Sequence, residues 1–186
     1  MRHRLALTFL LFSCCLAAQT VPGYLARGTV TITGPRGAAT GTITVALASG
    51  DRCSLTVDVS SPARPRRYTA VFDGTTAEVQ GPALLLQAAP PPIGPLVGCA
   101  LLMPHADGSD ATVTRAAGTA HASNLRWKQR GHMIALSYGY SSPAAALPDQ
   151  LTETVDGNTR LHVHFTSIAA KVFPISEFTV STGGAQ

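Results

Sequence analysis

Two histidines at strand spacing, His162 and His164, are the residues whose types and positions best suit chemistry. Residues two apart on a β-strand lie on the same face, so both imidazoles could bind one metal ion. No third ligand lies nearby in the sequence. Leu161, Val163 and Phe165 alternate with the two histidines, as in a strand with one dry and one wet face. That alternation accounts for the pair, and we expect no metal site.

Other catalytic arrangements are also missing from the sequence. His105, Asp107 and Asp110 could hold a cation, but their setting is typical of a solvated loop. There is no Gly-x-Ser-x-Gly motif, and the ten acidic residues lie mostly at turns, with no pair placed for acid–base work. We therefore expect no enzyme and no cofactor. An esterase-like or metal-dependent enzyme remains as a third alternative, and a hydrolytic activity lost on replacing His162 or His164 would favour it.

Three glycines, Gly34, Gly37 and Gly41, lie close together but do not precede a helical pattern. A phosphate-binding loop needs its glycines to open a helix, whereas these fall between two alternating segments. We interpret them as hairpin-turn residues.

The composition is poor in charge. Charged residues make up 13% of the 186 residues and hydrophobic ones 45%, whereas a soluble domain usually has about 25% charged residues. Such a chain buries most of its apolar surface or keeps part of it for a ligand.

The first 18 residues resemble an export signal. Arg2 and Arg4 precede a short apolar run, Leu5–Phe12, which is too short to span a bilayer. We predict cleavage near residue 18 and a single mature domain over residues 19–186. The alternative is a lipoprotein signal with Cys14 lipidated. The expected location is therefore the periplasm, or the cell envelope through a lipid anchor.

Loss of the signal removes two of the 14 basic residues, so the mature balance against 10 acidic residues is 12 − 10 = +2. This small excess does not favour a nucleic-acid partner. Two basic clusters, 64–67 and 126–130, could contact anionic lipid headgroups, with Trp127 at the interface. The interpretation we favour is charge at strand ends, which discourages edge pairing.

Cys53 and Cys99 are the cysteines left after the signal. In an exported protein two cysteines favour one disulfide, and the alternative is two separate buried thiols.

Alternating segments recur along the chain. Hairpin turns at 34–37, 49–51, 73–74 and 156–157 separate strands predicted over 27–33, 42–47, 53–59, 68–72 and 77–80. Further strands are predicted over 111–117, 133–140 and 151–155, with another over 161–166 and a last β-rich run over 178–180. Short links favour an antiparallel meander.

The segment from Gly81 to Pro104 is almost uncharged and is broken by prolines at 90–92. Prolines exclude a continuous helix, so we predict two short helical turns, about 83–88 and 95–103. Such an apolar segment has to be buried, and lying across a curved sheet would bury it.

Taken together, the Thr-rich meander, the proline-broken apolar segment and the C-terminal stretch 147–180 resemble the LolA-like lipoprotein-carrier superfamily. The C-terminal features are Leu147-Pro148 opening a strand, the Asp156-Gly157 turn, Ile168 and a closing Phe178. The resemblance implies a mainly β (α+β) fold: a twisted antiparallel sheet forming a half-open barrel around a short helical plug. It also implies an interior that holds acyl chains.

The dry faces of the strands would line that interior. Aromatic residues are only 6% of the chain, so few bulky side chains are present to fill a wide curved sheet. We expect an exported carrier of lipid or lipoprotein acyl chains, and the alternative is a structural or protein-interaction module of the envelope with a filled core. The predicted lining is Val30, Ile32, Ile43, Val45, Leu55, Val57, Val71, Leu96, Leu101, Leu102, Leu161, Val163 and Phe165.

Overall fold

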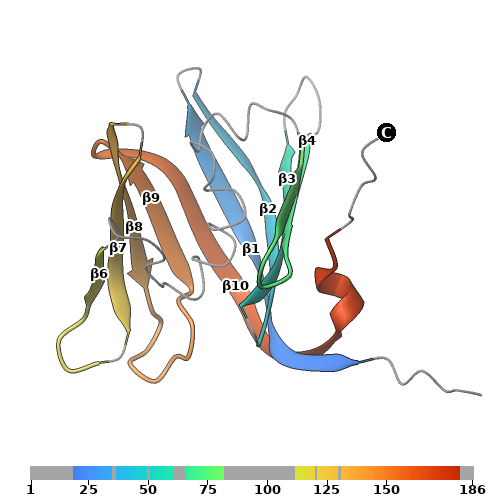
Figure 1. The fold of residues 1–186 in the computed structure, drawn as a ribbon. Coiled ribbons are helices and arrows are strands. Elements are labelled where there is room, and N and C mark those ends of the chain that lie inside the picture. Colours follow the sequence, from blue (N-terminus) through green and yellow to red (C-terminus); the bar gives the residue numbers. More distant parts are fainter. Residues whose placement is uncertain are drawn as a thin grey trace, which may run out of the picture.

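A computed structural model describes residues 19–34, 37–49, 51–60, 66–81, 112–119, 121–129 and 131–180 of the 186-residue chain. These residues form one antiparallel sheet of ten strands in the order β5-β4-β3-β2-β1-β10-β9-β8-β7-β6 (Figure 1). The strands β5 and β6 are its two edges and do not pair, so the sheet is open. The mainly β fold is confirmed, and the strands are β1 (Thr20–Gly34), β2 (Gly37–Ala48), β3 (Arg52–Ser60), β4 (Arg66–Phe72), β5 (Ala77–Gln80), β6 (Thr112–Arg115), β7 (Ala122–Gln129), β8 (His132–Gly139), β9 (Gln150–Val155) and β10 (Asn158–Pro174).

The first five strands pair in chain order, as the short links predict. The other five also pair as neighbours in chain order, from β6 to β10. One long-range pairing, β1 with β10, joins the two meanders. The strands β1 and β10 have 15 and 17 residues and are the longest strands of the sheet. In Figure 1 they lie between two wings, β2–β5 and β6–β9.

The strand β1 begins at Thr20, so the segment 19–26, expected to lie ahead of the first strand, belongs mostly to that strand. Its partner β10 is also longer than predicted and runs on to Pro174. The strands β1 and β10 pair with each other at thirteen positions. The alternation within one segment does not predict the length of these strands, because their partners are more than a hundred residues away in the chain.

A β-bulge in the centre of the sheet changes which residues face inward. Arg27 pairs with Ser167 and Gly28 pairs with Phe165, which leaves Thr166 as the extra residue of β10. An extra residue reverses the alternation beyond it. As a result Phe165 and Phe173, both odd-numbered, belong to clusters on opposite faces.

The last β-rich run is a wrong prediction. Residues 175–178 form a 3-10 helix, η1 (Ile175–Phe178), the one helix among the described residues. It covers the outer face of the sheet, where Phe178 packs edge-on against Phe173 with ring centroids 5.5 Å apart. Phe178 is buried at the end of this helix.

The predicted helical plug, 83–88 and 95–103, lies outside the described residues. No helix within the described ranges has the length and apolarity needed to cross a bilayer.

Candidate functional site

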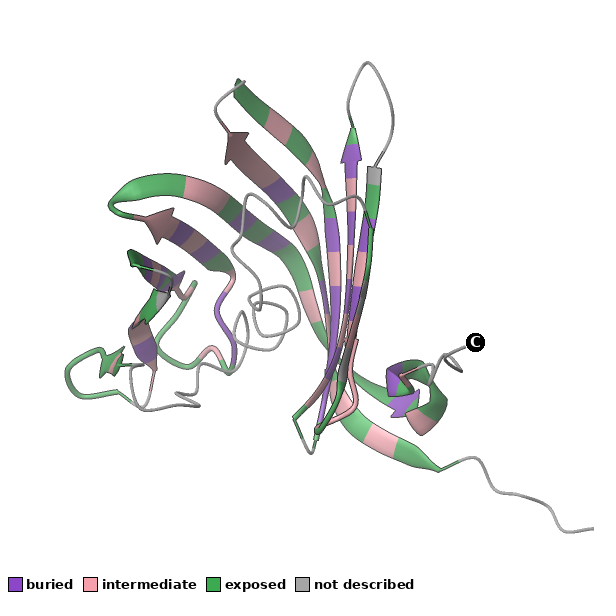
Figure 2. Cartoon of the chain, turned by 45° about the horizontal axis from the view of Figure 1, so that its top comes forward, coloured by how far each residue is buried: buried purple, intermediate pink, exposed green. Residues whose placement is uncertain are grey.

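One apolar cluster covers the inner face of the sheet and takes residues from both wings. Among the described residues its buried members come from eight strands, β1, β2, β3 and β4 on one side and β7, β8, β9 and β10 on the other, and Val113 of β6 packs against it. Buried residues alternate with half-buried or exposed ones along most of these strands (Figure 2). The physical cause is the pleat, which puts every second side chain on the same face.

Most of the predicted lining belongs to this inner-face cluster. Ile32 and Leu161 are partly buried and pack against it, and the fully buried members are Val30, Ile43, Val45, Leu55, Val57, Val163 and Phe165. The strand pattern therefore predicted the correct face for nine residues. Whether these residues bind lipid stays a prediction.

Val71 is on the wrong face. In β4 the residues that join the inner-face cluster are Tyr68, Ala70 and Phe72. The pairing of Leu55 with Ala70 sets this register, and Val71 then points to the opposite side of the sheet. The sequence pattern of Arg67–Phe72 contains apolar residues at both parities, so it did not decide between them.

Several predicted residues lie outside the described part of the chain: Leu96, Leu101 and Leu102 of the plug, Cys99, and Cys14 with the rest of the signal. Cys53 is buried, at 2% exposed, and is not a free thiol. Its predicted pairing with Cys99 stays a prediction.

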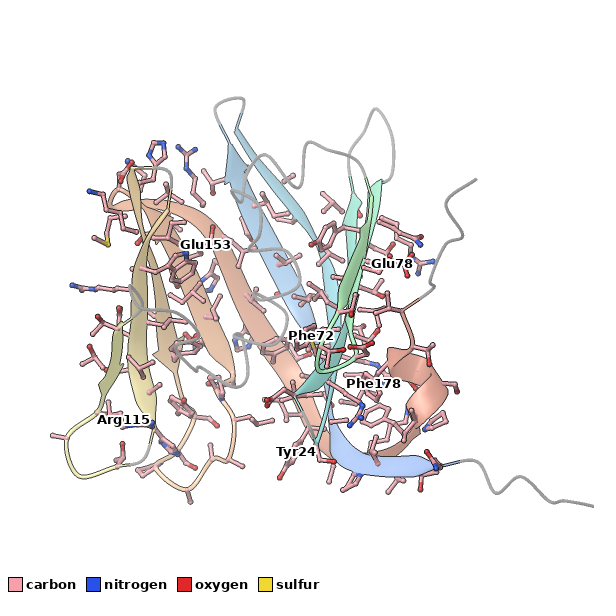
Figure 3. All side chains as sticks on the ribbon, viewed as in Figure 1. Tyr24, Phe72, Glu78, Arg115, Glu153 and Phe178 are labelled. Carbon is pink, nitrogen blue, oxygen red and sulfur yellow. The ribbon has the colours of Figure 1, made fainter. Side chains whose placement is uncertain are left out.

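Glu153 is a residue that the sequence analysis missed. It is the only buried charged residue of the described ranges, at 1% exposed, and lies on the inner face of β9 (Figure 3). Its cross-strand partners are Leu136 of β8 and Leu161 of β10, both apolar. Within the described ranges its Oε2 has no hydrogen-bond partner. Desolvation raises the pKa of this carboxyl to about 7.

The position of Glu153 in the alternation of its strand could have revealed it, because residues two apart in a strand share a face. Leu151 and Val155, both apolar, share its face in the segment 151–155. A charged residue between two dry positions breaks the alternation, and a buried polar group in such a place is informative.

Tyrosines add further polar atoms to the inner face. The Tyr68 hydroxyl is buried and has no hydrogen-bond partner within the described ranges. Burial raises the pKa of Tyr68 to about 12 and also raises that of Tyr138. At neutral pH both hydroxyls are protonated and can donate a hydrogen bond.

The two histidines of the sequence pattern are on the outer face. His162 and His164 are both exposed, and Nδ1 of His162 lies 3.1 Å from the Thr152 hydroxyl. No group of three His, Cys, Asp or Glu residues suited to a metal occurs within the described ranges.

The basic clusters are only partly described. Arg67 forms an ion pair with Asp58 at 3.0 Å on the exposed face. Trp127 packs against the inner-face cluster. It is only half-buried, and the interfacial role considered for it stays a prediction.

A groove of about 740 Å³ is lined by residues of β1, β2, β3 and β4. Its hydroxyl-bearing residues are Thr29, Thr31, Thr40, Thr42 and Ser60, and the exposed ion pair of Arg67 with Asp58 also lines it. The groove shares Val30 with the predicted lining.

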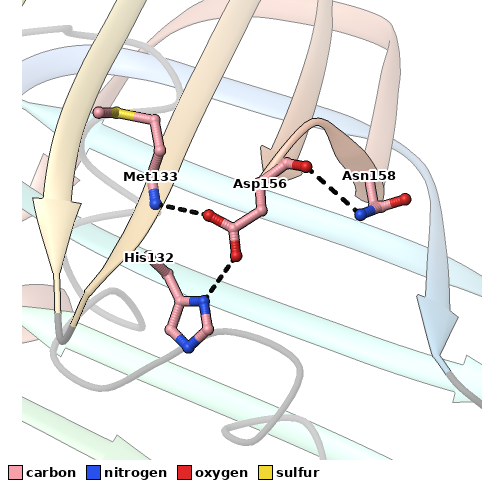
Figure 4. A network of polar contacts seen from close by, with 4 residues as sticks. All are labelled: His132, Met133, Asp156 and Asn158. Atoms are coloured by element: carbon pink, nitrogen blue, oxygen red, sulfur yellow. Dashed lines mark hydrogen bonds and ion pairs between the residues drawn. The ribbon is translucent and has the colours of Figure 1, made fainter.

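A network of hydrogen bonds joins the start of β8 to the turn between β9 and β10 (Figure 4). Asp156 accepts a hydrogen bond from the backbone N–H of Met133 at 2.8 Å, and its other oxygen lies 2.6 Å from His132 Nδ1. These contacts lower the pKa of Asp156. Asp156 has a positive φ of 50°, as predicted for the Asp-Gly turn.

Comparison with known proteins gives structural likenesses and no sequence match. No protein-family model matches this chain, and no curated protein matches it. A solved structure described as an outer membrane lipoprotein-sorting protein domain from Vibrio parahaemolyticus is similar in fold, with a TM-score of 0.47 and 6% identity, over 80% of this chain and 85% of that one. At that identity and TM-score the likeness carries no argument about function.

Proposed function

We propose that this protein is an exported carrier that holds acyl chains of a lipid or lipoprotein against the inner face of its open sheet. The observation that supports it is the single apolar cluster over eight strands of a sheet whose edges do not meet. Each methylene moved from water to such a surface contributes about 0.8 kcal/mol. A long chain can therefore bind without specific polar contacts, and we expect no catalysis.

Native mass spectrometry of the purified protein tests the proposal through lipid that copurifies. Val163→Asp places a charge at a fully buried inner position and should remove that lipid. Ile32→Asn places an uncharged polar amide at a half-buried inner position, with less risk to folding. Val71→Asp is the matched control, because Val71 lies on the opposite face, and it should keep the lipid. Lipid that remains in both inner-face variants, with native-like circular dichroism, would refute the proposed binding face.

A second candidate is an envelope module with a filled core. Val45, Ile134 and Val163 are 0% exposed, and such burial is also what a closed protein core shows. The absence of any copurified or added lipid in the native protein would favour this candidate over the carrier.

A further inference from the structure

The inner face contains polar groups that the apolar lining does not need. Glu153 has its Oε2 buried and without a hydrogen-bond partner within the described ranges, and the same holds for the hydroxyl of Tyr68. The two come from opposite wings, β9 and β4, and both are on the inner face. Asp149 Oδ1 is a third such atom, located in the loop before β9.

A buried carboxyl without a partner is costly, on the order of several kcal/mol when charged. Packing at position 153 does not require a carboxyl, because the neighbouring side chains of Leu151 and Leu136 are apolar and buried. The arrangement therefore suits a bound molecule that brings the missing partner. An ionised carboxyl accepts hydrogen bonds and attracts a cation, and charge-assisted hydrogen bonds are the strong ones.

We propose that Glu153 binds a protonated amine on the head of an amphiphile whose acyl chain lies on the inner face. This rests on the proposed carrier function and specifies its ligand class: a cationic, hydrogen-bond-donating head joined to a hydrocarbon chain. A plain fatty alcohol of the same chain length lacks the positive charge and should bind more weakly.

Dodecylamine and dodecanol serve as probes, measured by displacement of a fluorescent fatty-acid analogue from the purified protein at pH 8. In the native protein dodecylamine should bind at least ten times more tightly than dodecanol. Glu153→Gln keeps the size of the side chain and removes its charge, and it should abolish that preference while leaving dodecanol affinity within a factor of two. Glu177→Gln, an exposed residue of η1, is the matched control and should keep the preference.

The possible results separate the two proposals. Equal affinity for amine and alcohol in the native protein, or a preference that persists in Glu153→Gln, would overturn the role of Glu153 and leave the carrier proposal standing. Failure of both probes to bind the native protein would overturn the carrier proposal itself, and the inference with it.

Discussion

Glu153 is the residue at which this fold departs most from an ordinary apolar core. Its carboxyl has apolar cross-strand neighbours on both sides, Leu136 and Leu161, and desolvation raises its pKa to about 7. A carboxyl of this kind is neutral in acid and charged only at neutral pH and above. The ionisation of Glu153 therefore makes the free energy of unfolding depend on pH.

The first prediction concerns that dependence. The folded-state pKa of Glu153 is raised above the ordinary value of 4.5, so between these two values the native state binds more protons than the unfolded state. Its contribution to the free energy of unfolding therefore falls as pH rises from about 4.5 to 7, by on the order of 3 kcal/mol. Urea unfolding of native protein and Glu153→Gln at pH 4.5 and 8 should show this loss in the native protein alone. An equal pH dependence in both would contradict the burial of an ionisable carboxyl.

Gly28 is a second residue whose type the fold demands. It lies beside the bulge, and a Cβ there would overlap the carbonyl oxygen of His164. Glycine permits a close backbone approach. The hydroxyl of Thr166 donates to the Arg27 carbonyl at 3.3 Å on the other side of the same bulge.

Gly28→Ala should therefore lower the free energy of unfolding by about 2 kcal/mol or more, measured by urea denaturation. Gly34→Ala is its control, because a Cβ at Gly34 would have no heavy atom nearer than 4.0 Å, and it should change stability by less than about 0.5 kcal/mol. A similar loss in both variants would mean that close approach at Gly28 is not the cause.

The histidines yield a prediction of a different kind. Because His162 and His164 lie exposed on the outer face, replacing His162 with Ala should leave lipid occupancy unchanged in native mass spectra. Zinc should have the same weak effect on native and variant proteins in a thermal-shift assay. Zinc protection that disappears in the variant would establish a metal site, and hydrolytic activity lost in the variant would revive the enzyme alternative.

At the scale of elements, β10 and η1 determine most of what the sequence pattern could not. β10 pairs with β1 and β9, and its bulge puts Phe165 inside and Phe173 outside. The small cluster under η1 holds Ala46, Ala48, Phe173 and Phe178. That cluster covers outer-face surface which a continued strand would leave exposed.

Phe178→Ala tests that packing. The Phe178 side chain is 1% exposed, and truncating a buried Phe typically costs about 3–5 kcal/mol. The change should lower the free energy of unfolding by about that amount in urea, with lipid occupancy retained because the cluster is on the outer face. Ser176→Ala, in the exposed part of η1, is the control and should be near neutral. Loss of lipid in Phe178→Ala at matched folding would show that the outer cluster also shapes the inner face.

For the whole molecule, the open sheet decides which surfaces are available. The edges β5 and β6 are short strands of four residues each, and short edges limit pairing with other chains. Within the described residues the two meanders are hydrogen-bonded to each other through β1 and β10, and the inner-face cluster takes residues from both. The carrier proposal belongs to this scale, and its test is lipid occupancy.

The sequence by itself determined the β class, the meander of β1–β5, the turn residues and the dry face of nine of the predicted lining residues, because strand alternation and turn chemistry are local. It did not predict the strand β7. It did not determine the face of Val71, the turn at Phe178, the bulge or the burial of Glu153. Those depend on which strands become neighbours, and the β1–β10 pairing joins residues far apart in the chain. Tertiary structure decided them because register, and with it the direction of every side chain, is set by the partner strand.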